Sequence, residues 1–358
     1  MHASPPSRNG FQRDVAIYGA GIYGLCVAYA CARRGASVEV VDPHGIAAGA
    51  SGGIVGALAP HTPERWNALK AFQLDALLGA EDFWSQIEAQ SGQTSGYARC
   101  GRLQPIADEH ALSLANERAD NAQELWRGKA AWRIVPASAH ARWSPVSPTG
   151  MLIEDTLSAR LHPKTACAAL AKAITALGGA IVSQAASGAG ITVWATGWAG
   201  LVAMGKDLGT EVGGGVKGQA ALFDCDQRHR PQIFADGINI VPHADGTTAV
   251  GSTSERGFDD PAGTDAQLEA LLERARRIVP ALRPASVLTR WAGVRPRART
   301  RGPLVGPYPG RPGHFIANGG FKIGFGLAPL LGEVMADLIL DQRDRRPASF
   351  RSEALMDA

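Results

Sequence analysis

Three glycines and one carboxylate near the start of the chain carry its clearest chemical signal. Gly19, Gly21 and Gly24 follow one apolar run, and Asp42 ends the next, 18 residues after Gly24. In this GxGxxG pattern the first glycine permits a sharp turn, the second leaves space for a pyrophosphate, and the third lets a helix pack close to a strand. An acid about 20 positions further on accepts a hydrogen bond from a ribose hydroxyl. The pattern predicts a site for an ADP-containing dinucleotide and leaves FAD and NAD open.

These residues need a strand, a turn, a helix and a second strand to position them. We predict that residues 14–42 form this unit. The helix N-terminus, with Ile22 and Tyr23, offers unpaired backbone N–H groups and the positive end of the helix dipole to phosphates. A glycine-rich turn that binds nothing is the weaker alternative, because the strand, the helix and the acid all agree.

The composition indicates a globular protein of two domains. The chain has 358 residues, of which 45% are hydrophobic and 19% charged. This length exceeds the roughly 250–300 residues at which a single core stops growing. The net charge of +3 is too small to indicate a nucleic-acid partner.

Three features bear on where the protein acts. Its five cysteines form no CxxC pair, which favours a reducing cytoplasm. The polar residues 1–14 lack the apolar stretch of a signal peptide. Residues 173–205 carry no charge, but glycines and polar residues interrupt the run, so we predict buried sheet there. We therefore expect a cytoplasmic protein with no integral membrane segment.

Strands alternate with helices at both ends of the chain, and an antiparallel block lies between them. Residues 216–253 read as short strands separated by turn signals, and helices are predicted near 163–177 and 327–340. This order predicts an α/β fold with a Rossmann-like domain built from separated segments. A second, α+β domain with a mixed antiparallel sheet is inserted into it.

Several separated motifs occur together along the chain. In addition to Gly19–Gly24 they are Ala50–Gly53 with Gly56–Pro60, Val193–Gly197, Val216–Gln219, Val241–Pro242 with Asp245–Gly246, Val250–Glu255, Trp291–Pro296 and Gly319–Lys322. With these motifs, residues 13–341 resemble the D-amino-acid oxidase superfamily of FAD-dependent amine oxidoreductases. The glycine-oxidase-like and D-amino-acid-dehydrogenase-like branches are the most similar. The resemblance implies FAD as the cofactor, bound non-covalently, since Cys225 is the last cysteine and precedes the C-terminal region where some relatives attach flavin.

The resemblance also implies which residues surround FAD. Asp42 would bind the adenosine ribose, and the 50–60 loop would run along the pyrophosphate and the flavin edge. The start of the last helix would meet the flavin's pyrimidine side, where its dipole stabilises negative charge on the reduced ring. The implied cofactor-binding residues are Gly19, Gly21, Ile22, Tyr23, Gly24, Asp42, Ser51, Gly52, Gly53, Ala57, Leu58, Thr196, Gly197, Trp198, Gly319, Gly320, Phe321, Lys322 and Gly324.

Arg295 is the sharpest substrate candidate. A guanidinium matches a carboxylate with two parallel hydrogen bonds. In the family, the arginine of this Gly-x-Arg-Pro setting clamps the substrate's α-carboxylate. The resemblance then implies hydride transfer from Cα to flavin N5, giving an imine that hydrolyses to an oxo acid. A solvated arginine is the alternative, because Arg297, Arg299 and Arg301 follow at every second position.

Lys322 and His61 are further catalytic candidates, and no metal site is predicted. The family commonly has Gly-His-Phe/Tyr-Arg before the last helix, whereas this chain has glycine at position 320 and lysine at 322. Lys322 would contact flavin or substrate, or extend from the domain edge. His61 follows the flavin-edge loop and is either a site residue or structural. Asn239 stands where relatives that oxidise small amino acids often have a tyrosine, which leaves the substrate open.

The predicted domains follow from this scheme. Tails are expected at 1–11 and 346–358. The FAD-binding domain comprises 12–62, 148–212 and 293–345, and the substrate-binding domain comprises 63–147 and 213–292. The expected partners are a small amine or amino acid (glycine, sarcosine or a D-amino acid) and either O2 or a quinone as electron acceptor. The sequence leaves the oligomeric state open.

Three rival functions remain at this point. The oxidase half of a bifunctional tRNA wobble-uridine-modifying enzyme shares the fold, but the basic residues here amount to a short loop and the 343–346 segment. A non-catalytic flavin-binding protein and an NAD-dependent dehydrogenase are the others.

Overall fold

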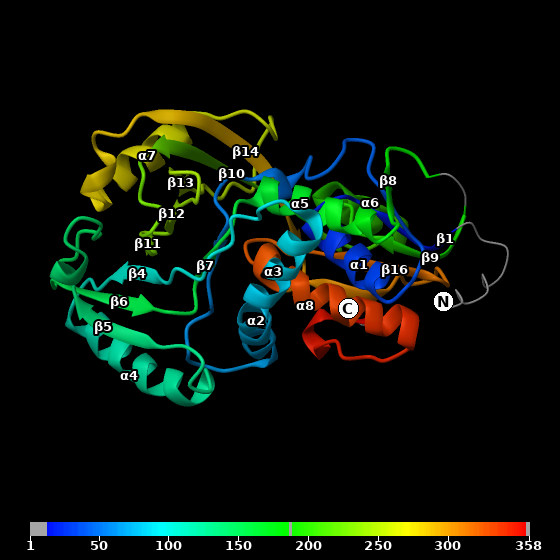
Figure 1. Ribbon diagram of the computed structural model, residues 1–358, viewed down its shortest axis with the longest axis horizontal. Coiled ribbons are helices and arrows are strands. Elements are labelled where there is room, and N and C mark those ends of the chain that lie inside the picture. Colours follow the sequence, from blue (N-terminus) through cyan, green and yellow to red (C-terminus); the bar gives the residue numbers. More distant parts are fainter. Residues whose placement is uncertain (1–12, 186–187, 356–358) are drawn as a thin grey trace.

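Two sheets organise the computed structural model, which describes residues 13–185 and 188–355. They occupy the two halves of the molecule in Figure 1. The first has six strands in the order β15-β16-β9-β1-β2-β8 and is parallel except for β15. Its strands are β1 (Arg13–Tyr18), β2 (Val38–Val41), β8 (Ala180–Val182), β9 (Ala189–Trp194), β15 (Leu304–Pro307) and β16 (His314–Asn318).

The second sheet has eight strands in the order β14-β10-β13-β12-β11-β4-β6-β5, all neighbours antiparallel except β11 and β4. A small two-stranded sheet, β3 with β7, joins the halves. These strands are β3 (Ala57–Leu58), β4 (Arg102–Pro105), β5 (Trp132–Pro136), β6 (Met151–Asp155), β7 (Ala159–Arg160), β10 (Gly213–Asp224), β11 (Gln232–Ala235), β12 (Ile238–Pro242), β13 (Thr247–Gly251) and β14 (Val287–Ala298).

Eight α-helices cover these sheets within the described residues. They are α1 (Ile22–Arg33), α2 (Ala68–Leu78), α3 (Ala80–Ser91), α4 (Glu109–Leu125), α5 (Pro163–Ala176), α6 (Gly197–Leu208), α7 (Ala266–Ile278) and α8 (Gly324–Asp341). Asn67, Asp108 and Asp265 cap α2, α4 and α7 by accepting a hydrogen bond from a first-turn N–H. No described helix is both long and apolar enough to cross a membrane.

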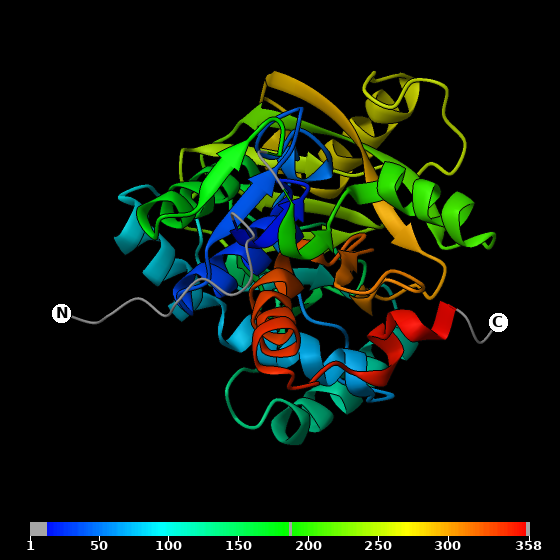
Figure 2. The same ribbon diagram turned by 90° about the vertical axis from the view of Figure 1, so that its right-hand side faces the viewer.

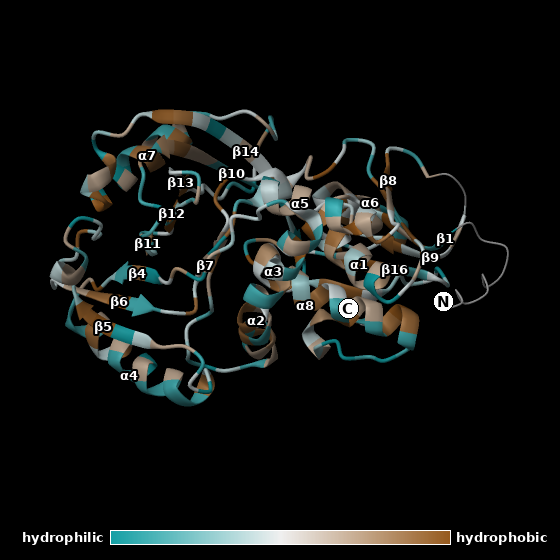
Figure 3. Ribbon diagram, in the orientation of Figure 1, coloured by the Kyte–Doolittle hydropathy of each residue, from teal (hydrophilic) through white to brown (hydrophobic). Residues whose placement is uncertain are grey.

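The largest core lies where α1, α5 and α8 pack together beside the first sheet. Helix α1 is buried from Ile22 to Ala32 because it contacts both α8 and α5. Figure 2 shows the first sheet beside these helices after a quarter turn. A second core lies between α7 and the large sheet. By contrast, α4 carries mostly hydrophilic residues (Figure 3), and only Ala115 and Ala122 are buried along it.

The fold confirms the predicted α/β class, a Rossmann-like sheet beside a mixed, largely antiparallel one. The segment 173–205 differs from the prediction of buried sheet, because it also holds the end of α5 and most of α6. It lacks charge because α6 buries Leu201 and Met204 on one face, while glycines and other uncharged residues fill the rest.

The domain boundaries stay a prediction, although several elements lie across them. Strand β6 comes from a segment assigned to the first domain but belongs to the second sheet. Helices α2 and α3, assigned to the second domain, pack on α8 and α5. Strand β14 continues across the predicted domain boundary at position 292, because it pairs with β10 along almost its whole length.

The C-terminal tail stays a prediction, although residues 346–355 contact the first sheet. Arg346 is buried, donates to the carbonyl oxygen of Val305 and pairs with Asp344 and Glu353. Residue Arg351 forms a bridge with Val305. Arg346 and Arg351 are therefore held against β15 of the first sheet. The predicted tail segments 1–11 and 356–358, with position 12, lie outside the described residues.

Candidate active site

A single large cavity joins the two halves of the molecule. Its volume is about 1180 Å³, larger than the roughly 300–1,000 Å³ of common small-molecule sites. Residues at the carboxyl ends of β1, β2 and β9 line one part of it, which is where parallel sheets bind ligands. Residues of β11, β12 and β14 line the other part. The cavity therefore spans both sheets.

The glycine-rich turn folds as its sequence predicts. Gly19 has φ of +111°, and a Cβ there would lie 2.3 Å from the carbonyl oxygen of Ala195. A Cβ on Gly24 would lie 1.9 Å from the carbonyl oxygen of Gly19. Both positions therefore exclude a side chain, and the start of α1 lies directly against the end of β1. Gly21, Ile22 and Tyr23 line the cavity, whereas Gly24 lies behind it.

Asp42 and Ser51 hold this turn in place. One carboxylate oxygen of Asp42 accepts from the backbone N–H of Ala20 at 2.9 Å, and the other accepts from that of His44 at 3.0 Å. The hydroxyl of Ser51 accepts from the N–H of Ile22 at 2.9 Å. Both side chains line the cavity. Asp42 thus stabilises the turn in addition to facing the predicted ribose position.

The other predicted cofactor residues mostly gather on the same cavity. Those that line it are Gly53, Ala57, Leu58, Thr196, Gly197, Trp198, Gly320, Phe321, Lys322 and Gly324. Gly52 and Gly319 do not line it and shape the turns beside it. The sequence motifs, which lie far apart along the chain, are therefore brought to one surface.

The segment before α8 shows why glycine replaces histidine at position 320. A Cβ on Gly320 would lie 2.9 Å from the hydroxyl oxygen of Tyr23. Tyr23 lines the cavity, and its hydroxyl is buried and has no hydrogen-bond partner among the described residues. Burial raises the pKa of Tyr23, so it is a neutral donor. A tyrosine on α1 thus occupies space that a side chain at 320 would need, and its free hydroxyl is a candidate cofactor contact.

Arg295 reaches the cavity from β14. Its guanidinium donates to three neutral oxygens, the Ser252 hydroxyl at 2.6 Å and the carbonyls of Lys217 and Thr253 at 3.1 and 2.7 Å. Its Nε is buried without a partner, and no ion pair reaches it from the described residues. Burial lowers the pKa of Arg295 to about 10, although Glu255 opposes the shift. The site therefore holds a partly buried cation that lacks an anion.

Lys322 lines the same cavity and is exposed to it. Its ammonium lies 5.7 Å from the centroid of the Phe321 ring, and the Arg295 guanidinium lies 5.8 Å from it. Partial burial, and then the charge of Arg295, lower the pKa of Lys322. Two cations thus face one cavity.

His61 does not line the cavity. Its ring Nδ1 contacts the amide oxygen of Gln73, which also accepts from the backbone N–H of His61 at 2.8 Å. Burial lowers the pKa of His61, so the ring is neutral. This placement gives no support to a catalytic role for His61.

Sequence reasoning left the pocket side chains of the 213–292 segment unassigned. The cavity is lined there by Phe234, Asn239, Ser252 and Trp291. The Trp291 ring lies 3.4 Å from where a Cβ of Gly53 would stand. Asn239 had a signal, as the position that replaces a tyrosine. Ser252 and Trp291 lie in the motifs Val250–Glu255 and Trp291–Pro296 but were given no role, and Phe234 had no signal.

Comparisons with known proteins give independent findings. The model of a family described as FAD dependent oxidoreductase (DAO) matches residues 14–338. Glycine oxidase from Pseudomonas putida is 36% identical over 145 residues, which span 40% of this chain and 39% of that protein. Glycine oxidase from Geobacillus kaustophilus is 26% identical over 372 residues, 94% of each chain.

Solved structures show the same fold. The crystal structure of the Geobacillus kaustophilus glycine oxidase superposes with a TM-score of 0.81 at 22% identity, covering 95% of this chain and 98% of that one. Iminodiacetate oxidase from Chelativorans sp. BNC1 gives a TM-score of 0.82 at 20% identity, covering 94% and 98%.

Proposed function

Because the chain belongs to the FAD dependent oxidoreductase (DAO) family, we propose that it oxidises the C–N bond of a small amine that carries a carboxylate. FAD is the cofactor of this family, and the cavity fits it. The glycine turn leaves room for a pyrophosphate, and the buried hydroxyl of Tyr23, a residue that lines the cavity, is a donor without a partner among the described residues.

The unpaired charge of Arg295 carries the proposal for the substrate. A partly buried guanidinium is costly unless an anion pairs with it. All its present acceptors are neutral oxygens, and its Nε faces none. A substrate carboxylate would supply the missing charge with a two-pronged geometry that a guanidinium favours.

Different residues of the cavity would bind the cofactor and the substrate. When bound, FAD supplies the acceptor for the two electrons removed from the C–N bond. Gly19–Gly24, Asp42 and Ser51 would hold its ADP part, and Arg295 would orient the substrate. Trp291 and Phe234 would exclude water from the reacting bond, since they are the large apolar side chains on that part of the cavity. Positioning is therefore the chain's main contribution.

Glycine, sarcosine and small D-amino acids are the proposed substrates, and O2 or a quinone the proposed acceptor. Two relatives support this class, since their names give glycine and iminodiacetate as substrates, which are both amines with carboxylates. The cytoplasmic location stays a prediction.

Two measurements test the proposal. The purified protein should show flavin absorption bands at about 370 and 450 nm. Anaerobic mixing with glycine, sarcosine, D-alanine and D-proline should bleach the long-wavelength band with at least one of them. Reoxidation in air would identify an oxidase, and reoxidation only with a quinone a dehydrogenase. A protein without flavin bands, or with bands that no amine bleaches, would exclude the proposed function.

A further inference from the structure

Three cationic side chains surround the ring of Phe321, more charge than a single carboxylate can neutralise. Arg295, Arg297 and Lys322 lie 5.8, 5.6 and 5.7 Å from the centroid of its ring. Among residues 13–185 and 188–355, neither Arg297 nor Lys322 has an ion pair or a side-chain hydrogen bond. Arg295 and Lys322 both line the cavity, whereas Arg297 does not.

The acid whose charge acts on Arg295, Glu255, already has partners of its own. Glu255 is buried, accepts from the side-chain amide of Gln219 at 3.0 Å and contacts the hydroxyl of Thr253. Its other oxygen lies 3.8 Å from the ammonium of Lys217, which is also buried. Glu255 therefore balances Lys217 and leaves the two cavity cations without a protein partner.

The backbone at Phe321 has an unfavourable conformation, and this conformation holds the ring between the cationic side chains. Its φ of +43° lies in the left-handed region, which costs a non-glycine residue roughly 1–3 kcal/mol. Its N–H donates to the carbonyl of Pro296 at 3.0 Å, next to Arg295 in β14. The two cation-bearing segments are thus fixed to each other, and Phe321 stands between them.

We propose that Lys322 forms a second anion subsite, so that the preferred substrate is an amine with two carboxylates, one bound by Arg295 and the other by Lys322. This inference rests on the proposed function. A monocarboxylate would leave the Lys322 charge unbalanced in the cavity, whereas a dicarboxylate neutralises both cations. Arg297 adds attraction for dianions from outside the cavity.

Binding of compounds that cannot be oxidised tests the subsite directly. The FAD-loaded protein is titrated with malonate, succinate and acetate, and the shift of the flavin spectrum gives each Kd. We expect a dicarboxylate to bind the wild type about three- to fivefold more tightly than acetate, as one added ion pair at an exposed lysine allows. Lys322→Gln should remove this advantage, so that the Kd values of the dicarboxylates and of acetate become equal within that variant. Lys322→Arg should retain the advantage, and the exposed control Lys172→Gln on α5 should match the wild type.

Oxidation of matched substrates separates this inference from the proposed function. Flavin bleaching is compared for iminodiacetate against sarcosine and for D-aspartate against D-alanine. Faster bleaching by the dicarboxylates, lost in Lys322→Gln, supports the subsite. Equal rates within each pair, or a preference that survives Lys322→Gln, overturns the subsite and leaves the proposed function intact. Bleaching by none of the four, and by neither glycine nor D-proline, overturns both.

Discussion

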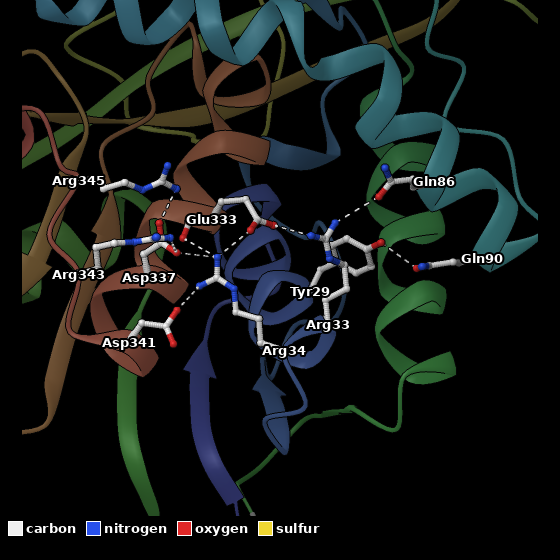
Figure 4. Close-up of polar contacts among 10 residues, drawn as sticks. All are labelled: Tyr29, Arg33, Arg34, Gln86, Gln90, Glu333, Asp337, Asp341, Arg343 and Arg345. Carbon is white, nitrogen blue, oxygen red and sulfur yellow. Dashed lines mark hydrogen bonds and ion pairs between the residues drawn. The ribbon is translucent and has the colours of Figure 1, made fainter. Parts of the chain in front are cut away.

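Two groups of arginines in this molecule differ in how their charge is balanced. Between α1 and α8, Arg34 pairs with Glu333 and Asp337, and Arg343 and Arg345 converge on the same Asp337 (Figure 4). In the cavity, Arg295 contacts only neutral oxygens. Each arginine of the first group faces an acid of the protein, whereas Arg295 faces none among the described residues. Matched charges connect elements of the fold, and an unmatched cation marks the place for a charged ligand.

The largest expected effect comes from removing the unmatched cation. Arg295→Ala should lower kcat/KM for a carboxylate-bearing amine by about 10³-fold, because the variant leaves the carboxylate unpaired. Steady-state kinetics measure the loss, and Arg295→Lys should recover only part of it, since an ammonium lacks the two-pronged geometry. Unchanged kinetics in Arg295→Ala would show that the substrate binds elsewhere.

The second-largest effect is expected when Asp337, the acid that the arginines share, is removed. Asp337 has no exposed side-chain surface and is contacted by Arg34, Arg343 and Arg345. Asp337→Ala should lower the free energy of unfolding by about 3 kcal/mol, because it leaves converging cations without their partner. Urea denaturation measures this change, and KM should stay the same. Asp341→Ala, whose side chain is 54% exposed, is the control and should cost far less. A loss of activity without a loss of stability in Asp337→Ala would contradict the division between the two groups.

The third prediction concerns a buried histidine beside the cavity. His243 donates from Nε2 to the carbonyl of Ile54, and its ring centroid lies 5.1 Å from that of His162. Burial lowers the pKa of His243 to about 4. A histidine with a depressed pKa stabilises the fold above its ordinary pKa of about 6.5, and this stability is lost as the pH falls from there toward 4. Thermal unfolding at pH 7 and pH 5 should show that His243→Gln loses less stability on acidification than the wild type, by about 2 kcal/mol. An equal acid sensitivity of both proteins would refute this assignment.

The smallest effect is expected at Tyr23. Tyr23→Phe removes only the free hydroxyl at Gly320. We expect the affinity for FAD to fall by about tenfold, as for the loss of one hydrogen bond, while stability without FAD is unchanged. Fluorescence titration of the apoprotein with FAD measures the affinity, with Tyr29→Phe as a control, since Tyr29 bonds Gln90 away from the cavity. An unaltered affinity would place the hydroxyl outside the cofactor site.

The sequence predicted the parts of the site that depend on local order. Gly19, Gly21 and Gly24 act within one turn, so their spacing alone predicts their geometry. Asp42 ends the strand next to β1, so its place also follows from a single strand pairing. Arg295 and Lys322 were identified through a resemblance, and the structure places both on the same cavity.

The rest depends on long-range pairing that no local pattern reveals. Ser252 meets Arg295 only because β10 pairs with both β13 and β14. His61 follows the flavin-edge loop in sequence, but its ring contacts Gln73 on α2 and does not line the cavity. The 346–355 segment is ordered by pairs with residues near in sequence and by contacts with β15. Each of these outcomes is decided by the fold rather than by the residue itself.

The most direct test of the account compares amines with and without a carboxylate under anaerobic conditions. Glycine is paired with methylamine, and sarcosine with dimethylamine. The flavin absorbance at about 450 nm is followed in the wild type and in Arg295→Ala. The account predicts that the carboxylate-bearing amine of at least one pair bleaches the wild type and that the amine without a carboxylate bleaches it little. Neither amine should bleach Arg295→Ala appreciably. Equal bleaching by both members of each pair, or normal bleaching of Arg295→Ala, would contradict the claim that the unmatched cation binds the substrate.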